Sequence, residues 1–309
     1  MSDTAPTGYQ NRYELRNRYV FRGQIVMQTA LHIGGGKATL SSSDSPIVLT
    51  PDQKPFIPGS SFKGALRSTV EKIVPALPIR ANFSSCALLE QSELLFPEKL
   101  NTSEPPPPWP EGACPTAYSN ELRRLRREFP AFDEAIIQDA ITHLCSTCHL
   151  FGSPLTSAHV YISDLYVPPG EWLGVVQTRD GVSIDRDSEK ARDRLKYDFE
   201  VVPASTTFAL EITLENATQE DLQLLCVGLS EFVNGFGTIG GKRSRGLGVA
   251  RLTELYVWEL DLEVADVNER NNRLANFLIS KRFSGEKLPG ETFLQDHIKL
   301  IFSSGGTGC

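Results

Sequence analysis

The regular alternation of apolar and polar residues constrains the fold of this chain more than any other feature. Over Thr206–Glu215, apolar side chains occupy every second position, which is the pattern of a strand with one buried face. The same period marks strands at Tyr19–Leu31, His159–Val167 and Gly246–Val257. The sequence therefore predicts four half-buried strands.

Two helices are predicted between these strands. Ser60 or Ser61 can cap a helix that runs to about Val74, and Thr218 begins a second helix that ends at Asn234-Gly235. The order strand, helix, strand, strand, helix, strand is that of an α+β ferredoxin-like, or RNA-recognition-motif, fold (βαββαβ). A further helix is expected at Asn271–Lys281, ahead of a Gly-rich end.

Length and composition describe a globular protein of one elaborated domain or two small ones. The chain has 309 residues, of which 40% are hydrophobic. No apolar stretch approaches the roughly 20 residues that span a bilayer. The N-terminal segment lacks the charged and apolar regions of a signal peptide. We therefore expect a soluble, cytoplasmic protein with no membrane partner.

The charge distribution is uneven. A net charge of -7 and a sequence pI of about 5.4 argue mildly against nucleic-acid binding. Basic residues nevertheless cluster at Arg12–Arg22, Arg123–Arg127 and Lys242–Arg245. Such runs are usually a solvated surface, and a basic groove on an acidic body is the alternative.

Two segments interrupt the order of strands and helices. Residues from about 77 to 150 hold a proline-rich linker, an arginine-rich helix and four of the six cysteines. A charged, weakly apolar run lies between Val175 and Glu200 and predicts a projecting hairpin or loop. Residues 1–18 form an N-terminal arm in this interpretation, and residues 259–309 form a C-terminal helical extension.

The cysteines of the insertion have a metal-binding pattern. Cys145-Ser-Thr-Cys148 has the spacing of a zinc knuckle, and two further cysteines of the insertion can complete a four-thiolate set. His143 or His149 can replace one thiolate. The competing interpretations are a pair of buried thiols or a redox motif, but a thioredoxin-like βαβ context is missing. We predict a structural zinc ion (Zn²⁺) bound by Cys86, Cys114, Cys145 and Cys148.

A glycine-rich, basic segment joins the second helix to the last strand. Gly237–Gly248 contains five glycines interleaved with Lys242, Arg243 and Arg245. Its plain interpretation is a flexible turn, and the spacing of a nucleotide-binding P-loop is absent. Close backbone approach together with phosphate-pairing charge favours binding of a polyanion.

A second segment, Leu31–Ser68, has a similar character. Its glycines permit close backbone approach to a ligand, and the amides at a helix start attract phosphate. The residues that we expect to contact phosphate here are Gly34, Gly35, Gly36, Ser60, Ser61, Lys63 and Arg67.

Asp44 is the only acid between Leu31 and Pro51. Ser-Asp-Ser-Pro is good turn chemistry, so the residues alone favour a turn role for Asp44 and a satisfied strand-end imidazole for His32. A lone acid facing a phosphate chain would instead mark a protein that grips a polyanion and cuts it. No Ser/His/Asp or Cys/His arrangement and no acid–base pair of carboxylates is evident.

Several of these segments resemble the RAMP superfamily, the repeat-associated proteins of CRISPR–Cas systems. The resemblance lies in Leu31-His-Ile-Gly-Gly-Gly36, Asp44-Ser-Pro-Ile47, Ile57-Pro-Gly-Ser-Ser-Phe-Lys-Gly64 and Gly240-Gly-Lys-Arg-Ser-Arg-Gly-Leu-Gly248. Cys148-His-Leu-Phe-Gly-Ser153 and Val182-Ser-Ile-Asp-Arg186 are similar to family segments as well. Within the superfamily, the chain is most similar to the backbone subunit of type III effector complexes, the "Cas seven" group, with a longer insertion.

The resemblance implies an RNA-recognition-motif palm, here residues 19–76 and 151–258, that binds CRISPR guide RNA. A thumb hairpin at about 175–200 would separate guide from target, and residues 77–150 would be the insertion. His32, Lys63, Arg67 and Lys242–Arg245 would hold guide phosphates. Asp44 would be the catalytic residue for cleavage of complementary target RNA, together with a divalent cation such as Mg²⁺. In this reaction the RNA 2′-hydroxyl attacks the adjacent phosphate. Other type III subunits, including the large signature subunit, would be partners.

Two alternatives accompany this hypothesis. In the first, the chain is a non-catalytic guide-binding subunit, Asp44 is a turn residue, and sister subunits cleave. In the second, the chain is a stand-alone nuclease that processes the CRISPR transcript. That class usually relies on His, Tyr or Lys acid–base chemistry, and no such cluster is evident here.

Overall fold

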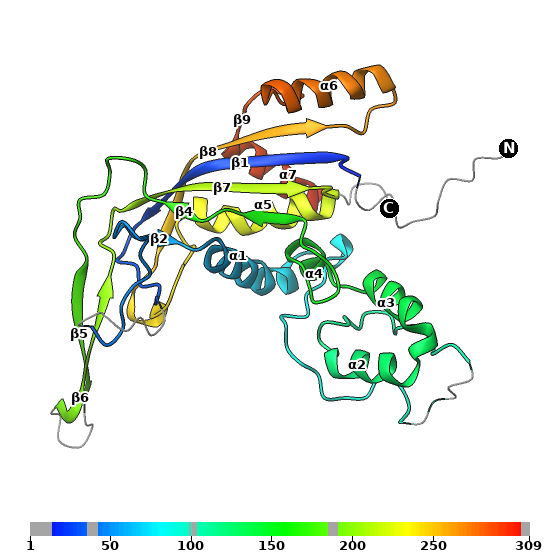
Figure 1. The fold of residues 1–309 in the computed structure, drawn as a ribbon, viewed down its shortest axis with the longest axis horizontal. Helices are drawn as coiled ribbons and strands as arrows, with labels where there is room; N and C mark the ends of the chain where they lie inside the picture. The colour runs from blue at the N-terminus through cyan, green and yellow to red at the C-terminus, as the bar shows by residue number, and fades with distance from the viewer. Residues whose placement is uncertain (1–13, 36–42, 99, 101–103, 185–190, 304–309) are drawn as a thin grey trace.

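The computed structural model describes residues 14–35, 43–98, 100, 104–184 and 191–303. Its centre is an antiparallel sheet of five strands in the order β3-β7-β1-β8-β9 (Figure 1). These strands are β1 (Asn17–Met27), β3 (Val160–Ile162), β7 (Thr207–Glu215), β8 (Ala250–Asp261) and β9 (Leu288–Pro289). The mixed α+β class predicted from the sequence is confirmed.

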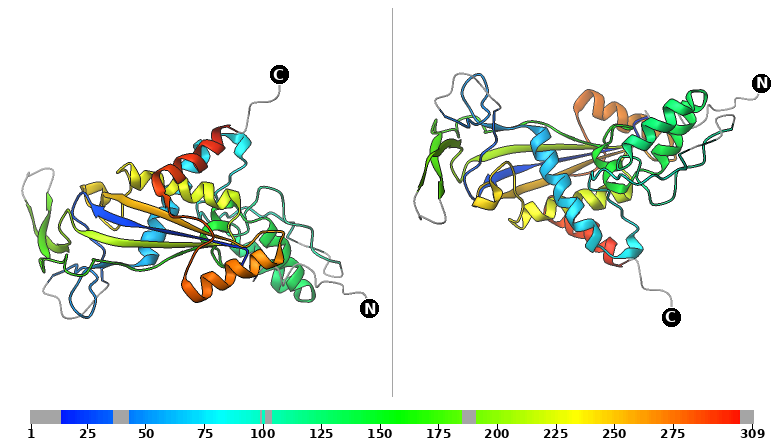
Figure 2. Two further views of the ribbon diagram at one scale, coloured as in Figure 1. Left: turned by 90° about the horizontal axis from the view of Figure 1, so that it is seen from above. Right: turned by 90° about the horizontal axis from the view of Figure 1, so that it is seen from below.

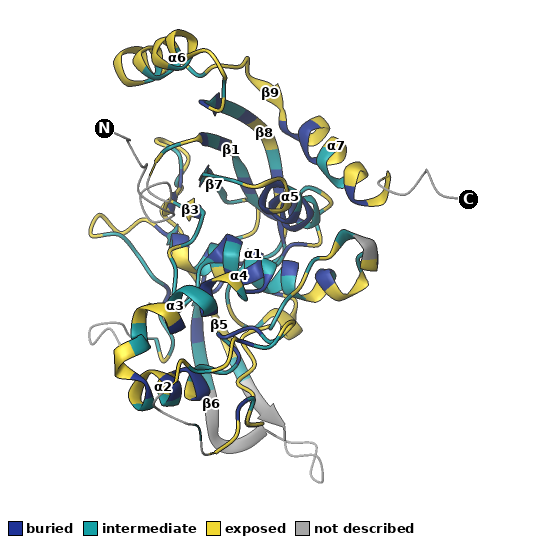
Figure 3. Ribbon diagram, turned by 90° about the vertical axis from the view of Figure 1, so that its right-hand side faces the viewer, coloured by how far each residue is buried: buried dark blue, intermediate teal, exposed yellow. Residues whose placement is uncertain are grey.

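Helices α1 (Gly59–Ile73) and α5 (Gln219–Val233) pack on one face of this sheet. Phe62 from α1 and Phe232 from α5 lie in ring contact at 5.1 Å, in one core with Phe21 and Phe208 of the strands. Gly228 lets the two helices approach closely, because a Cβ there would lie 2.7 Å from a methyl of Val70. The core of the molecule therefore lies between the sheet, α1 and α5, and Figure 3 shows buried residues along these elements.

The C-terminal segment contributes two helices on opposite sides of the sheet (Figure 2). Helix α7 (Gly290–Ser303) packs on α5 and buries Phe293 and Leu294 in the core. Helix α6 (Val267–Ser280) lies on the other face, where the Arg18 guanidinium sits 5.1 Å from the Phe277 ring. The sequence predicted α6 from Asn271 only, and it did not predict α7.

The second predicted strand, His159–Val167, is interrupted. Its first part is β3 of the main sheet, whereas β4 (Leu165–Tyr166) pairs with β2 (Phe56–Ile57) in a separate ribbon. The break occurs at Asp164, whose carboxylate accepts a hydrogen bond of 2.8 Å from the Gly59 amide. The start of α1 presses against the strand there, because a Cβ at Gly59 would lie 2.3 Å from the Ile162 carbonyl oxygen.

The same contact corrects the predicted helix cap. Helix α1 begins directly after Pro58, and neither Ser60 nor Ser61 caps it with its side chain. Asp164 satisfies the first amide from another segment, so a local serine cap is not needed. The cap of α5 is as predicted: Thr218 and Asp221 form a reciprocal capping box.

Two features lie at opposite ends of the long axis (Figures 1 and 2). At one end, β5 (Gln177–Ile184) and β6 (Ala191–Val201) form an antiparallel hairpin. At the other end lies the insertion, with α2 (Ser119–Glu128), α3 (Asp133–Thr142) and α4 (Ser146–Phe151). Short 3-10 turns occupy Val74–Ala76, Ile79–Ala81, Pro130–Phe132 and Arg243–Arg245. Among the described residues, no helix is both long and apolar enough to cross a membrane.

Candidate nucleic-acid interface and metal centre

The segment that carries Asp44 folds back on the glycine segment before it. The Gly35 amide donates to the Pro46 carbonyl at 3.0 Å, and the Val48 amide donates to the Ile33 carbonyl at 2.9 Å. A side chain at Gly35 would be crowded, because a Cβ would lie 3.0 Å from the Ile47 carbonyl oxygen. These contacts fix the glycine segment and the Asp44 segment against each other. Asp44 is exposed near the start of its segment. Gly36, a predicted RNA contact, lies outside the described residues.

Asp44 and Asp198 of β6 are joined by two reciprocal hydrogen bonds. The Asp44 amide donates to the Asp198 carboxylate at 2.6 Å, and the Asp198 amide donates to the Asp44 carboxylate at 3.1 Å. Farther along β6, the Glu200 carboxylate accepts from the Ile47 amide at 3.1 Å, and the Glu200 amide donates to the Ser45 carbonyl at 3.0 Å. The base of the hairpin therefore fixes the position and orientation of Asp44.

His32 is buried between the same segments. Its Nδ1 lies 2.7 Å from the Glu200 carbonyl, which can only accept, so Nδ1 carries the proton. Its Nε2 lies 3.3 Å from the Ser45 hydroxyl. With both ring nitrogens engaged, His32 ties the Asp44 loop to β6 in this structure. Its predicted contact with RNA phosphate stays a prediction.

The basic turn after α5 packs against the other side of β6. The Lys242 ammonium lies 4.5 Å from the centre of the Phe199 ring, and the Arg245 guanidinium contacts the Tyr197 hydroxyl. The Gly241 amide donates to the His32 carbonyl at 2.9 Å, which joins the two glycine segments. A Cβ at Gly240 would lie 2.4 Å from that same carbonyl oxygen. Two segments about 200 residues apart in the sequence thus meet at one place.

The alternation of β6 organises this meeting point. Tyr197 and Phe199 contact the basic turn, whereas Asp198 and Glu200 bond to the Asp44 loop. Sequence reasoning missed all four residues, because the run was interpreted only as a charged hairpin or loop. The signal was present in Tyr-Asp-Phe-Glu-Val, in which aromatic and acidic residues alternate with the period of a strand.

The predicted contacts on α1 lie elsewhere and bond within the protein. The Lys63 ammonium donates to the Val160 carbonyl at 3.1 Å, and burial, with the nearby Arg67 charge, lowers the pKa of Lys63. The Arg67 guanidinium donates to Glu71 at 2.8 Å and to the Gly152 carbonyl at 2.9 Å. Ser60 is exposed at the helix start, beside half-buried Ser61. The structure does not bring these residues into contact with the basic turn.

In the other two basic clusters, several arginines are paired with carboxylates. Arg22 lies 2.7 Å from Glu211 across the sheet, and Arg124 lies 2.6 Å from Glu121 on α2. Among the described residues, by contrast, no carboxylate forms an ion pair with the turn that holds Lys242, Arg243 and Arg245. Positive charge is therefore available to a ligand at this turn.

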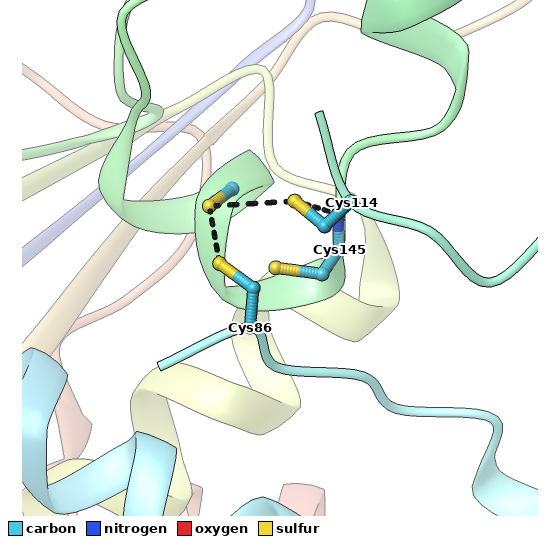
Figure 4. A group of neighbouring side chains, drawn as sticks. Cys86, Cys114 and Cys145 are labelled. Carbon is cyan, nitrogen blue, oxygen red and sulfur yellow. Dashed lines mark hydrogen bonds between the residues drawn. The ribbon is translucent and has the colours of Figure 1, made fainter. Parts of the chain in front are cut away.

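The four predicted cysteines of the insertion lie together. Figure 4 shows the sulfur atoms of Cys86, Cys114 and Cys145 pointing toward one another. The Sγ of Cys148 lies 3.6 Å from that of Cys86 and 4.0 Å from that of Cys114, and all four sulfurs lie within 4.8 Å of one another. Four sulfurs at zinc–sulfur distance in a tetrahedron would stand about 3.8 Å apart. The cluster therefore could bind a metal ion such as zinc.

Hydrogen-bond donors surround these sulfurs as they do in metal–thiolate sites. The Cys145 amide donates to the Cys114 Sγ at 3.4 Å, and the Arg67 guanidinium donates to the Cys148 Sγ at 3.2 Å. Hydrogen bonds from Cys114 and Cys148 lower the pKa of Cys145. None of the cysteines of the described residues forms a disulfide, so the four sulfurs are available as thiolate ligands once they lose their protons.

Residues 24–251 match the family described as the RAMP superfamily, which covers both glycine segments, the hairpin and the insertion. The chain belongs to this superfamily. The resemblance expected from the glycine and Asp-Ser-Pro motifs is thereby confirmed.

Shorter stretches of this RAMP protein match curated relatives. It is 42% identical over 59 residues to the CRISPR system Cms endoribonuclease Csm3 of Methanothermobacter thermautotrophicus, which is 18% of this chain and 24% of that relative. It is 46% identical over 59 residues to Csm3 of Enterococcus italicus, 18% of this chain and 28% of the relative. The chain therefore spans about a quarter of the length of the curated relatives it matches.

Proposed function

We propose that this RAMP protein is a guide-RNA-binding backbone subunit of a type III CRISPR effector complex and that it cleaves guide-paired target RNA at Asp44. The core strands with α1 and α5 serve as the RNA-recognition-motif palm, in residues 19–76 and 151–258. The β5–β6 hairpin is the thumb, and residues 77–150 are the metal-bearing insertion. The resemblance to endoribonucleases named Csm3 supports this proposal.

One observation carries the proposal. The strand β6 holds the Asp44 loop on one side and the basic turn on the other. A polyanion that follows the basic turn would pass along the base of the hairpin, close to an exposed carboxylate. Phosphate contacts of this kind give affinity without reading sequence, which base pairing with the guide supplies.

The cleavage chemistry is a transfer within the RNA. The 2′-hydroxyl oxygen bonds to the adjacent phosphorus while the bond from phosphorus to the 5′-oxygen breaks. The products are a 2′,3′-cyclic phosphate and a 5′-hydroxyl, so one proton leaves the attacking oxygen and one reaches the leaving oxygen. Asp44 orients the 2′-hydroxyl by accepting its hydrogen bond, and Asp198 keeps the Asp44 loop in place.

The donors near Asp44 suit a hard divalent cation. The carboxylate of Asp44 is exposed and is a ligand that Mg²⁺ prefers. Such an ion, when bound, would neutralise negative charge that develops on the phosphate. Asp44 is the residue that would hold it, and Asp198 keeps the Asp44 loop in position.

The test uses complexes assembled with guide RNA and a labelled complementary RNA. Asp44→Ala should lower the rate of specific cleavage by about 100-fold or more, the range expected for loss of a general acid–base group. The affinity for the target should be unchanged. Asp296→Ala, an exposed aspartate of α7, is the matched control and should cleave normally.

A second candidate function is a purely structural subunit. It is favoured by the bond from the Asp198 amide to the Asp44 carboxylate, which gives Asp44 a role in the loop without catalysis. An unchanged cleavage pattern in the Asp44→Ala complex would establish this alternative. Cleavage of precursor RNA by the isolated chain would point instead to a processing nuclease.

We also propose that the four cysteines bind one structural zinc ion. The spacing of the sulfurs and the donors around them support this site. Protein purified without chelators should contain stoichiometric zinc by elemental analysis, and Cys145→Ser should lose it. Cys226→Ala removes a buried thiol of α5 outside the cluster and should keep the metal. Wild-type protein without zinc would contradict the proposal.

A further inference from the structure

Next to the cysteine cluster lies a second group of metal-ligating side chains. His149 follows Cys148 on α4, His159 directly precedes β3, and Asp221 lies in the first turn of α5. One ligand atom from each lies within 4.8 Å of the other two. These residues belong to three different elements, so their meeting is a product of the fold.

The distances within this group suit a transition-metal ion. His159 Nδ1 lies 2.9 Å from the Asp221 carboxylate, and the rings of His149 and His159 stand 5.3 Å apart at an angle of 69°. Nitrogen and oxygen ligands at zinc distance in a tetrahedron would stand about 3.3 Å apart. The His159–Asp221 pair would open by a few tenths of an ångström, and His149 would close in by rotating its side chain.

The fold already holds the Asp221 carboxylate in this position. Asp221 is buried, with 3% of its side chain exposed, and it accepts hydrogen bonds of 3.0 Å from the amide and the hydroxyl of Thr218. The capping box therefore fixes the carboxylate in its rotamer. A rigid acid facing two imidazoles is a preorganised ligand set.

The group also has access to solvent. His149 and His159 both line a cavity of about 390 Å³, and His149 and Asp221 line a second of about 410 Å³. Three protein ligands leave a fourth position of a tetrahedral ion open to water or another small ligand. This differs from the cysteine cluster, in which four thiols fill the coordination sphere.

We propose that His149, His159 and Asp221 bind a second divalent transition-metal ion beside the cysteine cluster. Two imidazoles and one carboxylate suit Zn²⁺, Fe²⁺ or Ni²⁺ and not Mg²⁺. The ion joins the insertion, through α4, to β3 and α5 of the core. The site is distinct from Asp44, and its existence does not depend on RNA cleavage.

The test measures metal content and visible spectra on the full chain. Protein saturated with Zn²⁺ and then freed of loosely bound ions should hold two equivalents, and His149→Ala or His159→Ala should hold one. Asp221→Asn keeps an acceptor oxygen for the helix cap but loses the negative charge. This variant should also hold one equivalent of Zn²⁺. His297→Ala, a histidine of α7 bonded to the Phe293 carbonyl, is the matched control and should hold two.

Cobalt distinguishes the two sites. Thiolate-bound Co²⁺ has intense sulfur-to-metal absorption that a nitrogen and oxygen site lacks. The histidine variants should lose one Co²⁺ equivalent and keep the sulfur absorption, which also reports that the insertion is folded. Wild-type protein that binds one equivalent would overturn the proposal. Histidine variants that keep two equivalents, or that lose the sulfur absorption because His149 serves the cysteine site, would also overturn it.

Discussion

At the hairpin end, strand β6 holds the Asp44 loop and the basic turn through backbone hydrogen bonds and ring contacts. At the opposite end, the insertion packs around four thiols. The hairpin end is anchored to the large core of the sheet, and Asp44, Arg243 and Arg245 are exposed there. Among the described residues, the two clusters of the insertion hold nine buried apolar residues besides the cysteines. A core this small is rarely stable by itself, so we expect a bound metal ion to stabilise the insertion. RNA should bind at the opposite end, beside the hairpin.

Metal removal should produce the largest effect. In chelator-treated protein or the Cys145→Ser variant, amides of residues 77–150 should exchange hydrogen about 100-fold faster or more, because structural zinc typically contributes many kcal/mol to folding. The amides of β1, β7 and β8 should keep their protection. Hydrogen exchange with mass spectrometry measures both. Equal loss of protection across the sheet would show that the two ends are not independent.

Loss of the hydrogen bond between the Asp44 amide and Asp198 should have the second-largest effect. Asp198→Ala removes the acceptor for the Asp44 amide, and we expect target cleavage to slow by about 10-fold, which corresponds to one missing hydrogen bond of about 1.4 kcal/mol. Asp198→Asn keeps an acceptor oxygen and should restore most of the rate. Single-turnover cleavage with saturating target gives the comparison. Asn as damaging as Ala would mean that the negative charge, and not the hydrogen bond, is needed.

The basic turn should control the salt dependence of RNA binding. Replacing Lys242 and Arg243 with Ala should weaken guide RNA binding and lower the slope of log affinity against log salt by about 0.7 for each phosphate that the turn no longer neutralises. Lys54→Ala, an exposed lysine paired with Asp52, is the control. Titration at several salt concentrations measures this slope. An unchanged slope would remove the turn from the interface.

The smallest effect is expected on α2. Arg126 forms an exposed ion pair with Asp133 at 2.6 Å. Arg126→Ala should leave the midpoint of thermal unfolding nearly unchanged, because an exposed ion pair contributes little to stability, and guide RNA affinity should not change. Thermal unfolding and RNA titration check the two parts. A large loss of RNA affinity would place RNA on the insertion and break the contrast between the ends.

The sequence predicted the parts of the fold whose determinants are local. The alternation in β7 and the capping box at Thr218 depend on neighbouring residues, and both are confirmed. The break after β3 depends on Asp164 bonding to Gly59, about 100 residues away, so no local pattern reveals it. Helix α7 was missed although Phe293, Leu294 and Ile301 are spaced for one buried helix face.

The candidate sites divide in the same way. The cysteine cluster was predictable because two of its members have a characteristic spacing and the others lie in the same insertion. The partners of Asp44 were not, since Asp198 and Glu200 come from a strand more than 150 residues later. The predicted contacts of Lys63 and Arg67 came from their charge near a helix start and from the family resemblance. Neither shows that the fold already gives both side chains internal partners.

Hydrogen exchange of the full chain with and without guide RNA shows directly where RNA binds. We predict that RNA slows exchange in residues 43–48, 197–201 and 240–246, and that residues 77–150 are unaffected. Protection confined to the insertion, with the Asp44 loop and the basic turn unchanged, would contradict the central claim that RNA binds at the base of the hairpin.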